Sequence, residues 1–156
     1  MYKRQVLSSL DNGWSQTRVK GIPPPGALPS FAGRKVLLVE DNVVNQKVAL
    51  KMLACFGVDA HLAGNGREAL DELERNPYDL VLMDCHMPEM DGYAATRAFR
   101  ERERHSLLKR IPVVALTANA LVEDRERCID AGMDDHMSKP LMLEALSELL
   151  QRWLTA

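Results

Sequence analysis

Five short apolar or strand-like runs, each followed by a longer segment with helical spacing, constrain the fold of this chain more than any other feature. Three of the runs are continuously apolar and read Val36-Leu37-Leu38-Val39, Leu80-Val81-Leu82-Met83 and Val113-Val114-Ala115-Leu116. Such runs are typical of parallel sheets whose faces are both covered by helices. Strands that alternate with helices pair in parallel through right-handed crossovers. The pattern therefore predicts a single α/β domain with a (βα)5 doubly wound, flavodoxin-like parallel sheet and strand order 2-1-3-4-5.

The expected elements follow from apolar periodicity and from capping residues. Asp41 or Asn42 can cap the first helix and Asp91 the third, while Gly57 and Gly132 are placed to end the first and the fourth. The charged run 100–104 is interpreted as the solvated end of the third helix. We expect strands at about 36–39, 59–63, 80–83, 113–116 and 136–137, and helices at about 44–56, 67–75, 92–104, 122–131 and 141–154.

The N-terminal part of the chain differs from the rest. It contains Pro23-Pro24-Pro25-Gly26 and Pro29-Ser30 and shows no sustained helical or strand period. Proline-rich stretches interrupt regular elements. We therefore expect residues 1–33 to form a flexible N-terminal linker or tail, and residues 34–156 to form the folded domain. A domain behind such a leader suggests a piece of a longer protein.

Composition argues against several function classes. The chain has 156 residues, a net charge of −2 and 27% charged residues, which is ordinary for a globular domain and gives no basic surface for nucleic acid. No apolar stretch approaches the roughly 20 residues needed to cross a bilayer. We expect no direct nucleic-acid binding and no membrane contact by this domain. Cys55, Cys85 and Cys128 form no CxxC pair and are interpreted as reduced thiols of a cytoplasmic protein.

Charged and hydroxyl side chains follow four of the predicted strands. Glu40-Asp41 ends the first strand, Asp84 the third, Thr117 the fourth and Lys139 the fifth. The carboxyl ends of parallel strands share one edge, where ligands bind in open α/β sheets. Three crowded carboxylates need a compensating cation, and an all-oxygen set with few protein ligands suits Mg²⁺.

The same residues are typical of phosphoryl chemistry. Asp84, placed between a metal ion and an amine, can attack phosphorus as a carboxylate nucleophile and form an aspartyl phosphate. Lys139 would bring a point charge to one phosphoryl oxygen, and the Thr117 hydroxyl would donate a hydrogen bond to another. Positioning and charge neutralisation would then supply most of the catalysis.

From about residue 35 to 154, the chain resembles the receiver domain of two-component response regulators. Four motifs carry the resemblance, and they occur in order at the expected strand ends, which makes the match specific. They are Val39-Glu40-Asp41-Asn42, Met83-Asp84-Cys85-His86-Met87-Pro88-Glu89-Met90-Asp91-Gly92, Ala115-Leu116-Thr117-Ala118 and Ser138-Lys139-Pro140-Leu141. When Asn45-Gln46 and the run 131–140 are included, the residues of these motifs are most similar to those of receivers in hybrid sensor histidine kinases. A fragment of such a kinase is therefore expected, with a stand-alone single-domain response regulator as the alternative.

The resemblance implies a metal site and a phosphoacceptor. Asp84 is expected to accept the phosphoryl group. Glu40 and Asp41 are expected to be the acidic pair of the Mg²⁺ site, with Asp41 as a direct ligand beside Asp84. The backbone carbonyl of His86 is expected to complete the protein ligands.

Further roles follow from the same resemblance. Thr117 is expected to be the switch hydroxyl that moves toward the phosphoryl group. Lys139 is expected to contact that group, and its peptide bond to Pro140 is often cis in the family. His86 and Asn119, two residues beyond Asp84 and Thr117, are expected to tune the phosphoryl lifetime.

The family also implies partners. A histidine kinase or a histidine phosphotransfer domain supplies the phosphoryl group, and phosphorylation remodels the face made by segments 122–131, 136–137 and 141–154. The segment carries no kinase ATP-binding motif, so we expect transfer to its own Asp84 and slow autodephosphorylation, without ATP-dependent kinase activity. His136 departs from the family, which usually has Tyr or Phe there. We expect weaker coupling to the output face, or coupling tuned by pH.

Two other functions were weighed against the residues. A Mg²⁺-dependent phosphatase that works through an aspartyl phosphate would carry a second acid two residues after the nucleophile, where this chain has His86. A flavin-binding domain would need a loop that binds phosphate after the first strand, and Glu40-Asp41 would repel that phosphate. His86 and Glu40-Asp41 therefore agree better with a receiver domain than with either alternative.

Overall fold

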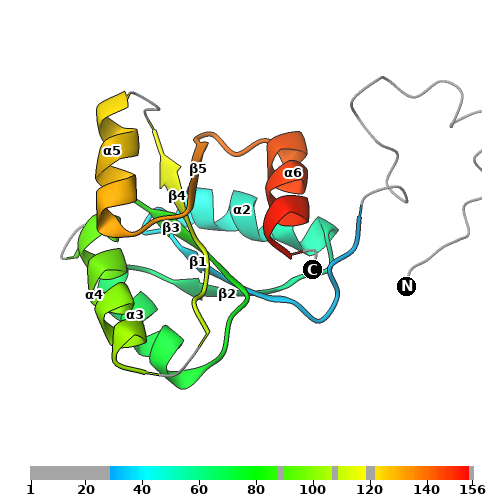
Figure 1. Cartoon of the computed structure of the whole chain (residues 1–156). Coiled ribbons are helices and arrows are strands. Elements are labelled where there is room, and N and C mark those ends of the chain that lie inside the picture. The colour runs from blue at the N-terminus through cyan, green and yellow to red at the C-terminus, as the bar shows by residue number, and fades with distance from the viewer. Residues whose placement is uncertain (1–28, 88–89, 107–108, 119–121, 155–156) are drawn as a thin grey trace, which may run out of the picture.

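A five-stranded parallel sheet in the order β2-β1-β3-β4-β5 forms the centre of the protein, as the sequence predicted (Figure 1). The computed structural model describes residues 29–87, 90–106, 109–118 and 122–154. The strands are β1 (Lys35–Val39), β2 (Asp59–Ala63), β3 (Leu80–Asp84), β4 (Val113–Thr117) and β5 (Asp135–Ser138). The helices are α2 (Val43–Cys55), α3 (Gly66–Arg75), α4 (Gly92–Arg104), α5 (Val122–Ala131) and α6 (Leu143–Leu154).

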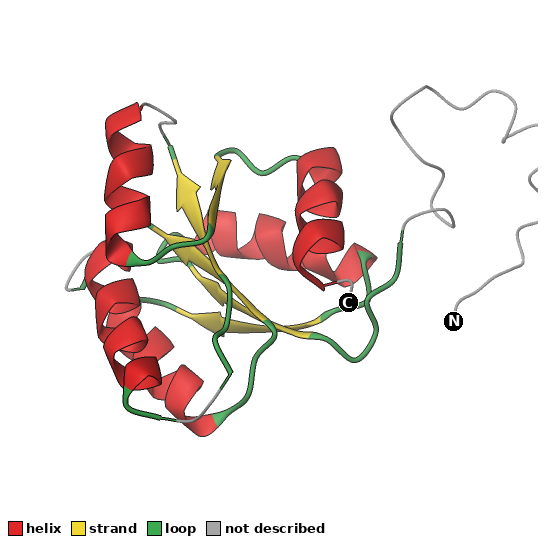
Figure 2. Ribbon diagram, viewed as in Figure 1, coloured by secondary structure: helices red, strands yellow, loops and turns green. Residues whose placement is uncertain are grey.

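Helices cover both faces of the sheet and create two hydrophobic cores. Helices α2 and α6 lie on one face, and α3, α4 and α5 lie on the other (Figure 2). Successive side chains of a strand point to opposite faces. In β1, Val36 and Leu38 therefore enter the α2/α6 core, whereas Leu37 and Val39 enter the core under α3, α4 and α5. This explains the continuous apolar runs 36–39, 80–83 and 113–116 in the central strands.

The helix ends follow the predicted capping signals closely. Asn42, rather than Asp41, caps α2, since its side chain accepts a hydrogen bond from the Asn45 amide at 3.0 Å. Asp91 caps α4 through the Ala94 amide at 2.9 Å. Glycines with φ of +73° and +102°, Gly57 and Gly132, follow α2 and α5. Helix α6 begins at 143, two residues later than predicted.

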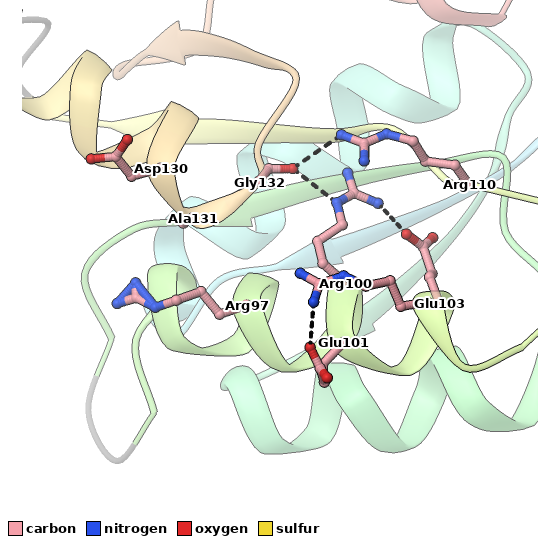
Figure 3. A pocket seen from close by; sticks show the side chains of 9 residues that line it. Arg97, Arg100, Glu101, Glu103, Arg110, Asp130, Ala131 and Gly132 are labelled. Atoms are coloured by element: carbon pink, nitrogen blue, oxygen red, sulfur yellow. Dashed lines mark hydrogen bonds and ion pairs between the residues drawn. The ribbon is translucent and has the colours of Figure 1, made fainter.

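The charged run at the end of α4 is only partly the solvated surface that was predicted. Arg100 is 7% exposed, and its guanidinium donates hydrogen bonds to the Gly132 carbonyl at 2.8 Å and to the Glu103 carboxylate at 2.7 Å (Figure 3). It also donates to the Asp134 carboxylate at 2.7 Å. The error arose because charge was taken as a sign of exposure. A buried arginine is tolerated when its donors are matched by acceptors, and here they join α4 to the segment after α5.

The packed part of the chain extends at least to Phe31, which the sequence placed in the linker. Its side chain is buried, its amide donates to the Phe56 carbonyl at 2.8 Å, and the two rings lie 6.4 Å apart. The rest of the predicted linker, residues 1–28, lies outside the described residues. Across the described ranges, no helix combines the length and the apolar character that crossing a bilayer requires.

Candidate metal centre

Adjacent strands bring the predicted acids to one point of the sheet edge. Strands β1 and β3 pair in parallel with Val39 opposite Met83, so Glu40 and Asp84 are the next residues on neighbouring strands. Glu40, Asp41 and Asp84 each offer a carboxylate oxygen, and these oxygens lie within 4.8 Å of one another. The convergence expected from the switch point of the sheet is therefore present.

The three acids differ in their surroundings. Glu40 and Asp84 are only 2% and 4% exposed, whereas the Asp41 side chain is exposed. Glu40 and Asp84 continue the alternation of Leu38 and Leu82, which face the α2/α6 core. The cluster thus has two buried carboxylates on one side of the sheet and a third at the solvent boundary.

Lys139 places an ammonium group between the two buried acids. Its Nζ lies 3.0 Å from Oε1 of Glu40 and 3.1 Å from Oδ2 of Asp84. Its backbone amide donates to the Thr117 carbonyl at 2.8 Å, which fixes the segment after β5 against the end of β4. The peptide bond between Lys139 and Pro140 is cis, as the resemblance implied.

Backbone amides and one amide side chain hold the acids in place, which the sequence analysis missed. The His86 amide donates to Oδ1 of Asp84 at 3.1 Å, and the Asn42 amide donates to Oε2 of Glu40 at 3.2 Å. The Gln46 side chain donates to the Glu40 carbonyl at 2.7 Å. An aspartate that accepts from the amide two residues later is a common turn, so the first contact was readable from the sequence around Asp84.

Burial and neighbouring charge separate the pKa values of the two buried acids. Burial and the nearby negative Glu40 raise the pKa of Asp84 to about 6, against the opposing effects of the His86 amide and Lys139. Burial also disfavours the ionised form of Glu40, but Lys139 and the Asn42 amide outweigh it and lower the pKa of Glu40 below its ordinary value. Burial opposes the charge on Lys139 too, yet Glu40 and Asp84 prevail and raise its pKa. Glu40 and Lys139 are therefore charged beside a carboxyl that holds its proton more tightly than usual.

The remaining predicted residues lie near the cluster in different ways. Thr117 is buried at the end of β4, beside β3, and His136 is half-buried in β5 opposite Ala115. The ring of His86 is exposed and meets the edge of Tyr93 with centroids 6.1 Å apart, while Cys85 is buried. Asn119 lies outside the described residues.

The donor set fits a hard divalent cation. Every ligand atom that the three acids offer is a carboxylate oxygen, and one ammonium group, which contacts two of them, leaves the cluster with an excess of negative charge. Mg²⁺ prefers oxygen ligands and commonly uses only one or two carboxylates together with water and phosphate oxygens. Asp41, being exposed, leaves the site open to solvent and to a second molecule.

Comparison with known proteins agrees with this geometry. A family model described as the response regulator receiver domain matches residues 36–151. Hybrid signal transduction histidine kinase K of Dictyostelium discoideum is 44% identical over 121 residues, which cover 75% of this chain and 10% of that protein. The chain thus spans about a tenth of the length of this curated relative.

Two solved structures are similar in sequence and fold. The receiver domain of a Pseudomonas aeruginosa sensor histidine kinase, with a magnesium ion coordinated in its active site cleft, is 47% identical with a TM-score of 0.72, covering 80% of this chain and all of that one. The receiver domain of the Saccharomyces cerevisiae response regulator Ssk1, crystallised with the histidine phosphotransfer protein Ypd1, is 30% identical with a TM-score of 0.75. That match covers 82% of this chain and 91% of the other.

Proposed function

This chain belongs to the response regulator receiver domain family, and we propose that it is the phosphoacceptor receiver of a two-component phosphorelay. A phosphohistidine of a histidine kinase or of a histidine phosphotransfer domain would donate its phosphoryl group to Asp84. The observation that carries the proposal is the placement of Asp84, which is buried at a strand end, touches Lys139, and lies within reach of Glu40 and Asp41.

The reaction requires little beyond positioning and charge. An oxygen of the Asp84 carboxylate forms a bond to phosphorus while the bond from phosphorus to the histidine nitrogen breaks, and the nitrogen keeps that electron pair. Because burial raises the pKa of Asp84, the Lys139 ammonium and the His86 amide serve to favour the ionised nucleophile. The same ammonium can then contact a phosphoryl oxygen.

Glu40, Asp41 and Asp84 would hold Mg²⁺, with the His86 carbonyl as the proposed further ligand. Bound there, the ion would neutralise charge on the phosphoryl oxygens and orient them. The Pseudomonas receiver, which holds magnesium in its cleft, supports this assignment.

Exposed apolar side chains on two sides of the site support the proposal that protein partners bind there. Val43, Val44 and Val48 are exposed on α2, which begins two residues after Asp41, and Val44 is 68% exposed. We propose that they contact the phosphohistidine donor. Ile129 on α5 and Met142 before α6 are also exposed, which supports an output partner at the α5–β5–α6 face. Exposed apolar groups of this kind are often binding sites.

We further propose that the chain is the receiver region of a hybrid histidine kinase located in the cytoplasm, with the part of the chain before Phe31 as a linker. The small share of the curated relative that the chain covers supports this origin. A stand-alone response regulator with the same chemistry is the alternative. In either context the segment itself would transfer phosphate only to and from Asp84.

Intact-mass spectrometry tests the proposal. The wild-type protein, Asp84→Asn and Asp71→Asn would be incubated with acetyl phosphate and Mg²⁺, where Asp71 is an exposed acid of α3 that serves as a matched control. We expect one added phosphoryl group on the wild type and on Asp71→Asn, and none on Asp84→Asn or after chelation of the metal. An equal adduct on Asp84→Asn would contradict the assignment of Asp84.

A further inference from the structure

One side chain outside the acidic cluster holds the backbone from which two of its acids project. Gln46 lies in the first turn of α2, and its Nε2 donates a hydrogen bond to the Glu40 carbonyl at 2.7 Å. The contact crosses six residues and is partly shielded from solvent. Its acceptor belongs to the peptide unit that joins Glu40 to Asp41, so the bond restrains the orientation of that unit.

The rest of the loop is held as well, but not at Asp41. The Glu40 amide donates to the Ala63 carbonyl at 3.1 Å, and the Asn42 amide donates to the Glu40 carboxylate at 3.2 Å. By contrast, no hydrogen bond or ion pair of the Asp41 carboxylate occurs among the described residues. The direction of this exposed side chain therefore depends on the backbone before it, which Gln46 restrains.

We propose that Gln46 is a positioning residue for the metal, since it orients the Glu40–Asp41 peptide and thereby aims the Asp41 carboxylate toward Asp84. The inference rests on the proposed function, in that it takes the three acids as the Mg²⁺ site. Mg²⁺ demands near-octahedral geometry with short bonds, whereas Ca²⁺ accepts longer bonds and irregular coordination. Gln46 therefore contributes more to Mg²⁺ affinity than to Ca²⁺ affinity.

Metal selectivity distinguishes this role from simple support of α2. A hydrogen bond that only stabilised the start of the helix would change thermal stability and leave the ratio of the Mg²⁺ and Ca²⁺ affinities unchanged. A bond that orients a ligand would change the ratio. Outer contacts that orient metal ligands typically contribute 10- to 100-fold to metal affinity.

The experiment is isothermal titration calorimetry with Mg²⁺ and with Ca²⁺ on the whole chain. Gln46→Met keeps the length of the side chain and removes its donor, while Gln46→Asn keeps the amide but is one methylene too short. The control is Gln151→Met, because Gln151 is an exposed α6 residue whose amide donates to the Ser147 hydroxyl of the same helix at 3.1 Å. Circular dichroism and thermal melts would accompany each titration.

We expect both Gln46 variants to bind Mg²⁺ about tenfold more weakly, with a smaller loss for Ca²⁺, and Gln151→Met to bind both ions as the wild type does. At saturating Mg²⁺ the phosphorylation rate of the Gln46 variants would return toward the wild-type value. Unchanged Mg²⁺ affinity in a folded variant, or equal losses for the two ions, would overturn the inference while leaving the proposed function intact. A wild-type protein that binds no Mg²⁺ would overturn both.

Discussion

The Lys139 ammonium lies 3.1 Å from Oδ2 of Asp84, yet the pKa of this carboxyl is raised to about 6 rather than lowered. The reason is that burial of Asp84, together with the negative charge of Glu40, outweighs the opposing effects of the His86 amide and of Lys139, whose ammonium also lies 3.0 Å from Glu40. Without metal, the proposed nucleophile is thus held in surroundings that favour its protonated form. The carboxyl is therefore a source of instability that a second cation can relieve.

The first prediction concerns the stability of the metal-free protein as a function of pH. An aspartate in an unfolded chain has a pKa near 4, whereas burial raises the pKa of Asp84 to about 6 in the folded protein. Between these values the folded state retains a proton that the unfolded state has lost, so this group makes the free energy of unfolding fall as pH rises. We expect the free energy of unfolding of Asp84→Asn to be about 2 kcal/mol higher than that of the wild type above pH 6. Near pH 4 the two proteins should have nearly the same stability.

Urea denaturation in the presence of a chelator, repeated from pH 4 to 7.5, measures this difference. The exposed Asp71→Asn variant is the control and should follow the wild type at every pH. A stability difference between Asp84→Asn and the wild type that stays constant over this range would show that burial of Asp84 does not disfavour its charge.

The second prediction concerns the close approach of α4 to the phosphoacceptor. A Cβ atom on Gly92 would lie 2.2 Å from the carbonyl oxygen of Asp84 and 2.9 Å from Cγ of Met83. The Gly92 amide also donates to the Cys85 carbonyl at 3.1 Å, so α4 is tied to the same loop. We expect Gly92→Ala to lower the free energy of unfolding by about 3 kcal/mol and to slow phosphorylation, because the backbone of Asp84 must shift.

Gly64→Ala is the matched control, since its nearest neighbour is a flexible oxygen of Glu68 at 3.4 Å. This variant should stay within about 0.5 kcal/mol of the wild type. Chemical denaturation and the rate of acetyl phosphate labelling would be measured on both variants. Equal behaviour of the two would argue that the approach of α4 is not tight.

The third prediction concerns the buried ion pairs of Arg100. Arg100→Met would leave the half-buried carboxylates of Asp134 and Glu103 without this cation, and we expect a loss of about 3 kcal/mol. Arg97→Met is the control, because Arg97 is an exposed residue of the same helix, lies apart from this cluster, and makes no ion pair within the described part of the chain (Figure 3). Thermal melts should separate the two variants by several degrees, and similar melts would contradict the prediction.

The fourth prediction concerns His136, which stands where the resemblance to receiver domains implied Tyr or Phe. It is half-buried on β5, beside the proposed output face. We expect His136→Tyr to enlarge the response of α5 and β5 to phosphorylation, because a larger apolar ring gains more from moving inward. Amide hydrogen exchange with and without beryllofluoride measures this response, and an identical change in both proteins would count against the expectation.

Much of the fold was predictable because each strand signal was strong and local. The run 36–39 is apolar at every position, and Asp91 stands immediately before α4 as a cap should. The family and the strand order were confirmed. The start of α6 was placed two residues early, because the apolar residues Leu141 and Met142 continue the helical pattern without being helical.

The site was predictable at the level of which acids converge, since strand ends in a parallel sheet share an edge. What the sequence could not reveal is the set of contacts that hold the acids, such as the Gln46 bond to the Glu40 carbonyl. That contact depends on a side-chain rotamer and on the path of a loop. The burial of Arg100 was missed for a similar reason, because two of its acceptors, Gly132 and Asp134, lie more than thirty positions away.

The division of the apolar side chains between two faces of the sheet has a consequence for how the protein can change. The buried carboxylates extend the α2/α6 side, whereas Arg100 and the packing of α4 and α5 belong to the other. Substitutions on opposite sides share few neighbours, so their effects on stability should add. Apart from Gly92, which abuts the Asp84 backbone, the residues of α4 and α5 could therefore be replaced one at a time for new partners without retuning the acids that perform the chemistry.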